Sequence, residues 1–326
     1  MRRSDILKIP VISVLMLVLS CVAGTRFFGP DPDFSNYVDM LTYPNYIDRV
    51  VDLFFQFMVF LNTNLFPNYW VVFFIYAILG VSIKTIAIFK YSEHPGLSYC
   101  VYIMMFYLLH EYTQIRGGVA AGILLFSFYY IYIGDFKKFI ASISIASLFH
   151  LSSLVVLPFY FFVRNYNLRS FFFVAIVAFL FAIFSYFSGD FVRSIVHAYM
   201  SANDSGINLG AVLDFNLLNK MNLSHFIIAL ICYFFYVKGM VFKQSELSVV
   251  YIKLLFVGVG SFYFFGALGL VATAYRISYI FLPVLIFIIP MLLYTIKPRV
   301  IPFVFIVLYL LINLLYLVDN VIWVNQ

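Results

Sequence analysis

Nine long apolar segments constrain what this chain can fold into. They run over residues 9–28, 70–90, 97–114, 117–134, 170–188, 223–242, 249–271, 274–295 and 300–318. Each approaches the roughly 20 residues that an α-helix needs to cross the apolar core of a bilayer. Because a helix satisfies its backbone hydrogen bonds internally, it is the natural way for such segments to span a membrane. The sequence therefore predicts an all-α, polytopic integral membrane protein.

The composition leaves almost no room for a soluble domain. The 326 residues are 64% hydrophobic and 10% charged, whereas soluble domains contain about 25% charged residues. We expect a single transmembrane domain over residues 1–326, with about 9–11 transmembrane helices. The apolar segment that follows the basic start is interpreted as an uncleaved first span rather than as a signal peptide.

Two apolar segments are irregular. Residues 50–66 carry Asp52 among several polar residues, and residues 139–163 are interrupted at His150 by His-Leu-Ser-Ser. One interpretation places 50–66 along the outer face and makes 139–163 a hairpin of two half-helices that enters from the cytoplasm. The alternative is that both segments cross fully. Broken helices at membrane depth are tolerated where they face protein or a wet cavity, so a hairpin would itself mark a site.

The basic residues favour the first interpretation. Fourteen of the 20 then lie on the cytoplasmic side, as cytoplasmic loops are enriched in Lys and Arg. These fourteen are Arg2, Arg3, Lys8, Lys84, Lys90, Lys137, Lys138, Arg164, Arg169, Lys238, Lys243, Lys253, Lys297 and Arg299. The net charge of +6 does not indicate nucleic-acid binding, because the basic residues are scattered at span ends rather than gathered in one patch.

Two sizeable loops then lie on the outer face, over residues 29–69 and 189–222. Both exceed ordinary connector lengths, which favours a functional role. The first is rich in Tyr, whose flat ring stacks on sugar rings, and in Asp and Asn, which hydrogen-bond sugar hydroxyls.

Most cations on the outer side are arginines, namely Arg26, Arg49, Arg116, Arg193 and Arg276. Arginine binds phosphate oxygens through two parallel hydrogen bonds, so this set predicts a lipid-linked phosphate or pyrophosphate as ligand. The alternative for each arginine is that it reaches up to lipid headgroups or pairs with a nearby acid. That alternative weighs more for Arg26 and Arg49 than for Arg116 and Arg276, which lie beside apolar spans.

Arg116 is the most informative of them. A charge next to hydrocarbon costs about 2.5 kcal/mol or more at the bilayer centre and usually serves a function. Gly117 and Gly118 follow it, and a helix N-terminus there would add backbone N–H donors and a positive dipole end for a phosphate. Two glycines also serve plain helix packing, so this part of the signal is weak.

Other polar residues could join the reaction. His150, within an apolar segment, could orient a pyrophosphate, shuttle a proton or act as a base; it could also simply cap a helix break. Glu111, Asp31 and Asp33 are the carboxylates considered as the base, since one carboxylate near the pyrophosphate suffices for glycosyl transfer. The three cysteines show no metal-ligand spacing, and no P-loop or GxSxG motif is present, so no metal or cofactor is expected.

Three stretches resemble the EpsG family, which contains Wzy-type polymerases of bacterial surface polysaccharides. They are Gln-Ile-Arg-Gly-Gly-Val-Ala at 114–120, Gly-Asp-Phe-Lys at 134–137 and Ala-Ser-Leu-Phe-His-Leu-Ser-Ser-Leu at 146–154. Ala-Tyr-Arg-Ile-Ser-Tyr at 274–279 is similar to a second arginine region of that family. The acidic stretch from Asp31 to Tyr37 is similar to its outer-face Asp-x-x-x-Tyr region. The chain departs from the pattern at Gly117-Gly118, where a polar residue often follows the arginine, and at Ser153, where alanine is common.

The resemblance implies a GT-C-like polymerase in the bacterial cytoplasmic (inner) membrane. Such an enzyme joins oligosaccharide repeat units carried on undecaprenyl pyrophosphate, at the outer face of that membrane, to build O-antigen, lipopolysaccharide, capsule or exopolysaccharide. It implies no nucleotide cofactor, and a chain-length regulator and a flippase as partners. The residues that the resemblance and the charges mark as catalytic are Arg116, Arg276, His150, Asp31, Asp33 and Glu111. Those expected to bind substrate are Gln114, Gly117, Gly118, Tyr37, Arg193, Tyr275 and Tyr279.

Two other functions stay open at this stage. A flippase or transporter of lipid-linked sugars would also use intramembrane arginines, but it predicts internal repeats, which the sequence does not show clearly. A membrane O-acyltransferase would use an intramembrane histidine as base, with an Asp or Asn nearby, whereas His150 has only serines close by in sequence.

Overall fold

A computed structural model describes residues 3–43, 52–188, 194, 216–239 and 245–321. Within these residues every regular element is a helix, and the described part of each of the nine predicted spans is largely helical. Seven helices of the described part are long and apolar enough to cross a membrane. The prediction of an all-α, multi-pass membrane protein is confirmed.

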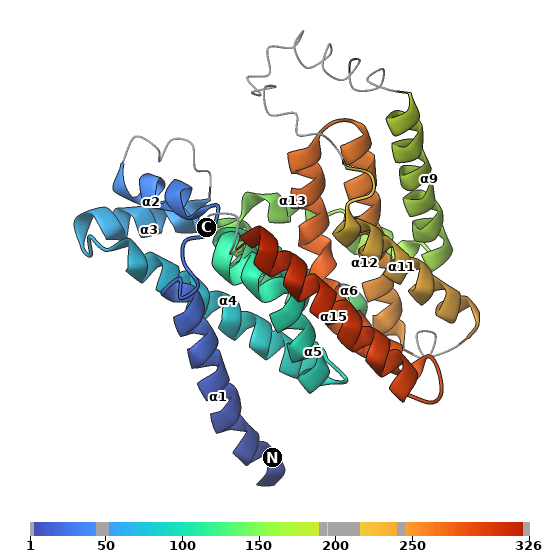
Figure 1. Cartoon of the computed structure of the whole chain (residues 1–326), viewed down its shortest axis with the longest axis horizontal. Coiled ribbons are helices and arrows are strands. Elements are labelled where there is room, and N and C mark those ends of the chain that lie inside the picture. Colours follow the sequence, from blue (N-terminus) through green and yellow to red (C-terminus); the bar gives the residue numbers. More distant parts are fainter. Residues whose placement is uncertain (1–2, 44–51, 189–193, 195–215, 240–244, 322–326) are drawn as a thin grey trace. The chain divides into compact units, whose positions relative to one another are not determined.

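The chain divides into two compact units. The first contains Met1–Leu157 together with Leu292–Gln326, and the second contains Pro158–Met291. Both are drawn in Figure 1, and each is described by itself. The expectation of a single transmembrane domain over 1–326 stays a prediction.

In the first unit, the helices over residues 69–91 and 115–133 pack closely against each other at glycines. Its elements are α1 (Arg3–Gly24), α2 (Phe34–Thr42), α3 (Leu53–Asn64), α4 (Tyr69–Tyr91), α5 (Pro95–Val101), η2 (Tyr102–Thr113), α6 (Ile115–Ile133), α7 (Phe136–Phe149), η3 (Leu151–Val156), η7 (Leu292–Tyr294) and α15 (Val300–Val321). Helix α4 packs against both α1 and α6, α6 packs against α7, and α15 packs against η2 (Figure 1). A Cβ added at Gly122 of α6 would lie 3.0 Å from Ile83 of α4, so the two backbones approach closely there.

The segment η2 is a π-helix of 12 residues, which the apolar pattern at 97–114 did not distinguish from an ordinary α-helix. A helix with i→i+5 hydrogen bonds has about 4.4 residues per turn, so residues nine apart lie two turns apart on one face. Tyr102 and Glu111 are such a pair, and the Tyr102 hydroxyl donates to Glu111 Oε1 at 3.0 Å. In an α-helix the same two side chains would point to opposite faces.

The second unit is organised around one central helix, α12. Its elements are α8 (Phe159–Asn165), α9 (Leu168–Phe187), α11 (Lys220–Val237), α12 (Glu246–Ala267), α13 (Val271–Phe281), η6 (Leu282–Val284) and α14 (Leu285–Met291). Helices α9, α11 and α13 all pack against α12 (Figure 1). The predicted span 274–295 is broken into α and 3₁₀ pieces near Pro283 and Pro290. Proline lacks the N–H that an unbroken helix requires, which accounts for these breaks.

The predicted outer loops differ from simple loops. Residues 29–69 contain the helices α2 and α3. Helix α3 has 12 residues and is therefore about 18 Å long, too short to cross the roughly 30 Å core of a bilayer. Most of the second predicted loop, 189–222, lies outside the described residues.

Two lysines counted on the cytoplasmic side are buried within their units. Lys84 is 0% exposed and binds Glu111, and Lys253 is 8% exposed and donates to the carbonyl of Val163 at 2.7 Å. Their place on the cytoplasmic side stays a prediction. Sequence alone could not show their burial, because a lysine one turn inside a span looks the same whether it pairs in the core or reaches the headgroups.

Candidate functional site

The first turn of α6 carries the central residue of the site. Gln114 precedes this helix, which begins at Ile115, and the N–H of Gly118 donates to the carbonyl of Gln114 at 2.7 Å. The N–H groups of the residues before Gly118 have no carbonyl of the same helix to bind. Arg116 therefore sits among backbone donors and at the positive end of a 19-residue helix, an arrangement that favours an anion.

Arg116 binds a carboxylate from α3. Its Nη1 donates to Oδ2 of Asp52 at 2.7 Å. The guanidinium lies over the rings of Tyr37 and Phe55, with its carbon 5.6 and 5.1 Å from their centroids. The Arg116 side chain is 22% exposed and that of Asp52 is 7% exposed, so the arginine retains an open side while the carboxylate is enclosed.

The same carboxylate reaches the helix break at His150. The backbone of His150 is extended, with φ −154° and ψ 108°, between α7 and η3. Oδ1 of Asp52 accepts the N–H of Leu151 at 2.9 Å, and Oδ2 lies 3.7 Å from Nδ1 of His150. The interruption that the sequence predicts at His150 is present, and Asp52 links it to Arg116. Entry of this segment from the cytoplasm as a hairpin stays a prediction.

Asp52 is held as an anion by this environment. Burial by itself raises the pKa of its carboxyl, but the facing His150, the N–H of Leu151 and the charge of Arg116 together bring that pKa below its usual value. Sequence reasoning noted Asp52 as a polar interruption of an apolar segment and gave it no role. An acid in such a segment was the signal that could have identified it.

The two glycines after Arg116 have different surroundings. A Cβ at Gly118 would overlap the carbonyl oxygen of His110, so this glycine allows η2 and α6 to approach closely. A Cβ at Gly117 would meet Cδ2 of His150 at 3.9 Å, an ordinary contact. Gly117 thus faces the histidine of the site, whereas Gly118 faces the packed interior.

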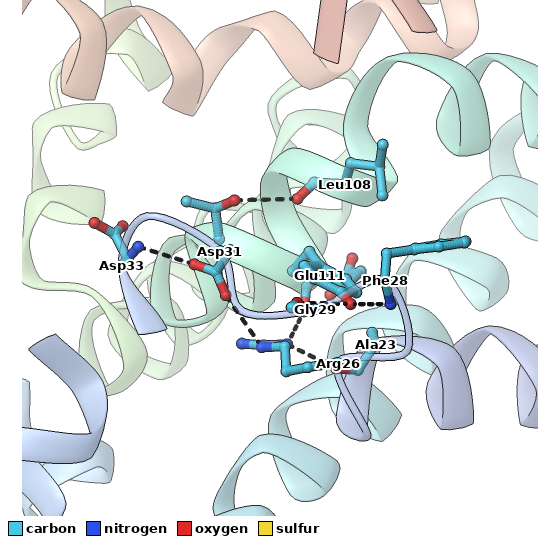
Figure 2. A network of polar contacts seen from close by, with 10 residues as sticks. Ala23, Arg26, Phe28, Gly29, Asp31, Asp33, Leu108 and Glu111 are labelled. Atoms are coloured by element: carbon cyan, nitrogen blue, oxygen red, sulfur yellow. Dashed lines mark hydrogen bonds and ion pairs between the residues drawn. The ribbon is translucent and has the colours of Figure 1, made fainter. Parts of the chain in front are cut away.

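Asp31 lies in a separate network (Figure 2). Its Oδ2 is 3.1 Å from Nε of Arg26, its Oδ1 accepts the N–H of Asp33 at 3.0 Å, and both charged side chains are almost fully buried. Arg26 has φ +53°, a left-handed conformation that is uncommon for a residue other than glycine. Nη1 of Arg26 also donates to the carbonyls of Ala23 and Glu111 at 2.7 and 3.3 Å. This network ties the segment after α1 to η2.

Glu111 points into the interior of the first unit. Lys84 of α4 donates to Oε1 of Glu111 at 2.5 Å and to the carbonyl of Gly118 at 2.6 Å. The carboxylate lies so close to Gly80 of α4 that a Cβ there would overlap Oε2. Glu111 is 1% exposed, so its contacts are with the helices that support Arg116.

The remaining residues marked by the sequence belong to the second unit or lie outside the described residues. Arg276 is exposed on α13. The neighbouring Tyr275 accepts a hydrogen bond from Nδ2 of Asn219 at 3.1 Å, and its ring lies 5.7 Å from that of Tyr279. Arg193 lies outside the described residues.

No cluster of three or more His, Cys, Asp or Glu side chains that could hold a metal ion occurs among the described residues. The Arg116 site itself offers a partly open guanidinium, backbone N–H donors at the start of α6, an enclosed carboxylate and an imidazole. Such a set can bind an oxyanion and exchange a proton beside it.

The comparison with known families agrees with the motifs at the site. A model of the EpsG family matches residues 10–325, which is nearly the whole chain. No curated protein and no solved structure matches it.

Proposed function

The chain belongs to the EpsG family of Wzy-like polymerases, and from this membership and the Arg116 site we propose that it polymerises lipid-linked oligosaccharides. The substrates are repeat units carried on undecaprenyl pyrophosphate. The site lies at the outer face of the bacterial inner membrane, and the product is a surface polysaccharide such as O-antigen or capsule.

The observation that carries the proposal is the anion-binding geometry at Arg116. The arginine already holds a carboxylate at 2.7 Å, and phosphate oxygens match the same donors. The backbone N–H groups at the start of α6 add to them, and 22% of the side chain remains accessible. In apolar surroundings such a group binds an anion more strongly than it would in water.

The reaction that we propose is a glycosyl transfer. A sugar hydroxyl of one lipid-linked unit attacks the anomeric carbon of the growing chain, and the bond to the lipid pyrophosphate breaks with its electron pair on the pyrophosphate. Arg116 stabilises the negative charge that develops on this leaving group. Such electrostatic stabilisation is usually the largest contribution to catalysis. Arg276, which is exposed on α13 of the second unit, is proposed as a further residue of the reaction on the basis of its sequence motif.

Aromatic residues would bind the sugars. Tyr37 lies under the guanidinium of Arg116, and Tyr275 and Tyr279 flank Arg276 in sequence. Flat rings of this kind suit the apolar faces of pyranoses. Because the lipid pyrophosphate itself is the activated donor, the proposed reaction uses no nucleotide. A flippase would supply its substrate, and a chain-length regulator would set the extent of the product.

A membrane O-acyltransferase is the second candidate, and one observation favours it. Such an enzyme uses a histidine beside an acid as base, and His150 lies 3.7 Å from Asp52. The polymerase explains more of the site, because an acyl transfer gives no role to the arginine that shares this carboxylate.

The test is complementation of a deletion strain at matched protein levels in the membrane. Wild type is expected to restore a ladder of long chains, whereas Arg116→Ala and Arg116→Lys leave single capped units. Arg276→Ala is expected to shorten or abolish the ladder. Arg169→Ala and Arg169→Lys are the matched controls, since Arg169 is an exposed arginine on α9, and they should restore the wild-type ladder.

Three outcomes would contradict the proposed function or the proposed role of Arg116. If the deletion leaves chain length intact but removes a substituent such as an acetyl group, the acyltransferase replaces the polymerase. If no lipid-linked unit reaches the outer face, a transporter does. If Arg116→Lys polymerises as well as wild type, two-pronged binding of the pyrophosphate by Arg116 is wrong.

A further inference from the structure

Asp52 occupies the N-cap position of α3 but does not cap that helix with its side chain. Aspartate is among the preferred N-cap residues because its carboxylate ordinarily accepts an N–H of the following turn. Here the carboxylate points away from its own helix and binds partners 64 and 99 residues further along the chain, Arg116 and Leu151. Its position is therefore determined by α6 and the His150 break rather than by α3.

Burial makes this placement costly unless the carboxylate has partners. Asp52 is 5% exposed, and an enclosed carboxylate must be paired and hydrogen-bonded. Leu151 supplies a donor to Oδ1 and Arg116 supplies one to Oδ2. Nδ1 of His150 is buried without a hydrogen bond and lies 3.7 Å from Oδ2. Hydrogen bonds between catalytic groups are often long in a ligand-free protein and shorten when substrate binds.

Two of the three carboxylates considered as the base are enclosed and paired with a buried cation. Asp31 is 2% exposed and pairs with Arg26, and Glu111 is 1% exposed and pairs with Lys84. The third, Asp33, is half-buried and its backbone N–H binds Asp31, in the network of Arg26 rather than that of Arg116. A base must reach the proton that it removes, and an enclosed carboxylate that neutralises a buried cation is poorly placed to do so. His150, whose side chain is 26% exposed, is accessible and lies beside the arginine that we assign to the pyrophosphate.

We propose that His150 is the base of the glycosyl transfer and that Asp52 is the residue that positions it. The inference rests on the proposed polymerase function. Asp52 accepts Nδ1–H of the neutral imidazole, which leaves the lone pair of Nε2 for the substrate. The proton of the attacking hydroxyl passes to Nε2 as its oxygen bonds the anomeric carbon, and the pyrophosphate leaves with the electron pair of the broken bond. The imidazolium then releases the proton to water.

One carboxylate thereby serves both halves of the reaction. It orients the guanidinium that faces the leaving group and compensates the positive charge that forms on the imidazole. A histidine oriented by an acid is a recurrent arrangement, in which the acid selects the tautomer and stabilises the imidazolium without itself taking the proton.

The experiment uses the purified full-length protein in vesicles, with a short-chain lipid-pyrophosphate-linked repeat unit as substrate. We expect kcat to fall by about 100-fold or more in His150→Ala and in His150→Asn, in line with the usual contribution of a general base. KM should change little, since Arg116 is untouched. Added imidazole should restore activity to His150→Ala, and this is a readout that a merely structural histidine would not give.

His150→Asn is the control for misfolding, because its side-chain amide can still donate a hydrogen bond to Asp52. Asp52→Asn should lower kcat strongly in the wild-type background and by a clearly smaller factor in His150→Ala, where only its effect through Arg116 remains, because residues that act as a unit are not additive. Additive losses would overturn the role given to Asp52. Absence of imidazole rescue, or a near wild-type rate in either His150 variant, would overturn the role given to His150 while leaving the polymerase intact. A wild-type protein that forms no polymer would overturn both.

Discussion

Arg116 and Asp52 are joined by a hydrogen bond of 2.7 Å between Nη1 and Oδ2, although 64 residues separate them in sequence. The pair connects the first turn of α6 to the start of α3. Through its other oxygen, Asp52 also holds the backbone at Leu151. Three elements that lie far apart in sequence, α3, α6 and the break at His150, thus meet at one carboxylate.

The first prediction concerns acid stability. Folded Asp52 has a pKa below its unfolded value, so its contribution is complete above the unfolded pKa of about 4 and is lost as pH falls through the folded value. Wild type should therefore be more stable than Asp52→Asn at pH 7, and the difference should shrink below about pH 4. Thermal unfolding in detergent at several pH values measures this, and a difference that does not change with pH would contradict it.

The second prediction separates the two glycines. Gly118→Ala places a methyl group against the carbonyl of His110. Because this forces α6 and η2 apart, the free energy of unfolding should fall by about 1–3 kcal/mol. Gly117→Ala meets its nearest atom at 3.9 Å and should keep or slightly raise stability, since alanine suits a helix better than glycine. The midpoint of thermal unfolding of the two purified variants checks the order. Equal stability of both would show that the close approach of η2 and α6 is not required.

The third prediction concerns the ion pair behind the site. Lys84 and Glu111 are 0% and 1% exposed. Removing one charge leaves the other buried without a partner, which should cost about 3–5 kcal/mol. We expect Lys84→Met to be destabilised to that extent and Lys84→Met/Glu111→Gln to recover much of the loss.

Unfolding of these variants in detergent, arranged as a double-mutant cycle, gives the coupling between the two residues. Lys90→Met is a matched control, because Lys90 is an exposed lysine on the same helix. Independent, additive effects of the two substitutions would mean that the pair does not hold α4 and η2 together.

The fourth prediction concerns Asp31. If it serves to neutralise Arg26, Asp31→Asn should lower stability and polymer length together, because Arg26 would remain buried with a neutral partner. Protein yield, unfolding temperature and polysaccharide ladder should be measured on the same membranes. A variant with wild-type stability and no polymer would instead support Asp31 as the base, against the role given to His150.

The break at His150 and the seven membrane-length helices of the described residues follow from local pattern. Length and hydropathy determine whether a segment can cross a bilayer, and a histidine with serines interrupts an apolar helix wherever it occurs. Arg116 is likewise conspicuous in the sequence, since a charge beside hydrocarbon is costly whatever its partner. These features need no knowledge of what lies next to them in space.

The role of Asp52 could not be predicted from the local sequence pattern. Its partners are distant in sequence, and the sequence shows Asp52 only as a polar interruption of an apolar segment. The burial of Lys84 could not be predicted because its acid lies on another helix. The π-helix η2 could not be distinguished from an α-helix because apolar content does not reveal i→i+5 bonding. The distinction between Gly117 and Gly118 likewise depends on which atoms face each Cα.

Sequence by itself therefore determined that this is a multi-pass helical membrane protein with an arginine at the start of one span and a helix break at His150. Tertiary structure decided which carboxylate meets that arginine, which glycine allows close packing and which lysine is buried. The physical reason is that transfer into a membrane is set by the residues of a single segment, whereas the pairing of buried charges is set by the three-dimensional packing of segments far apart in the chain.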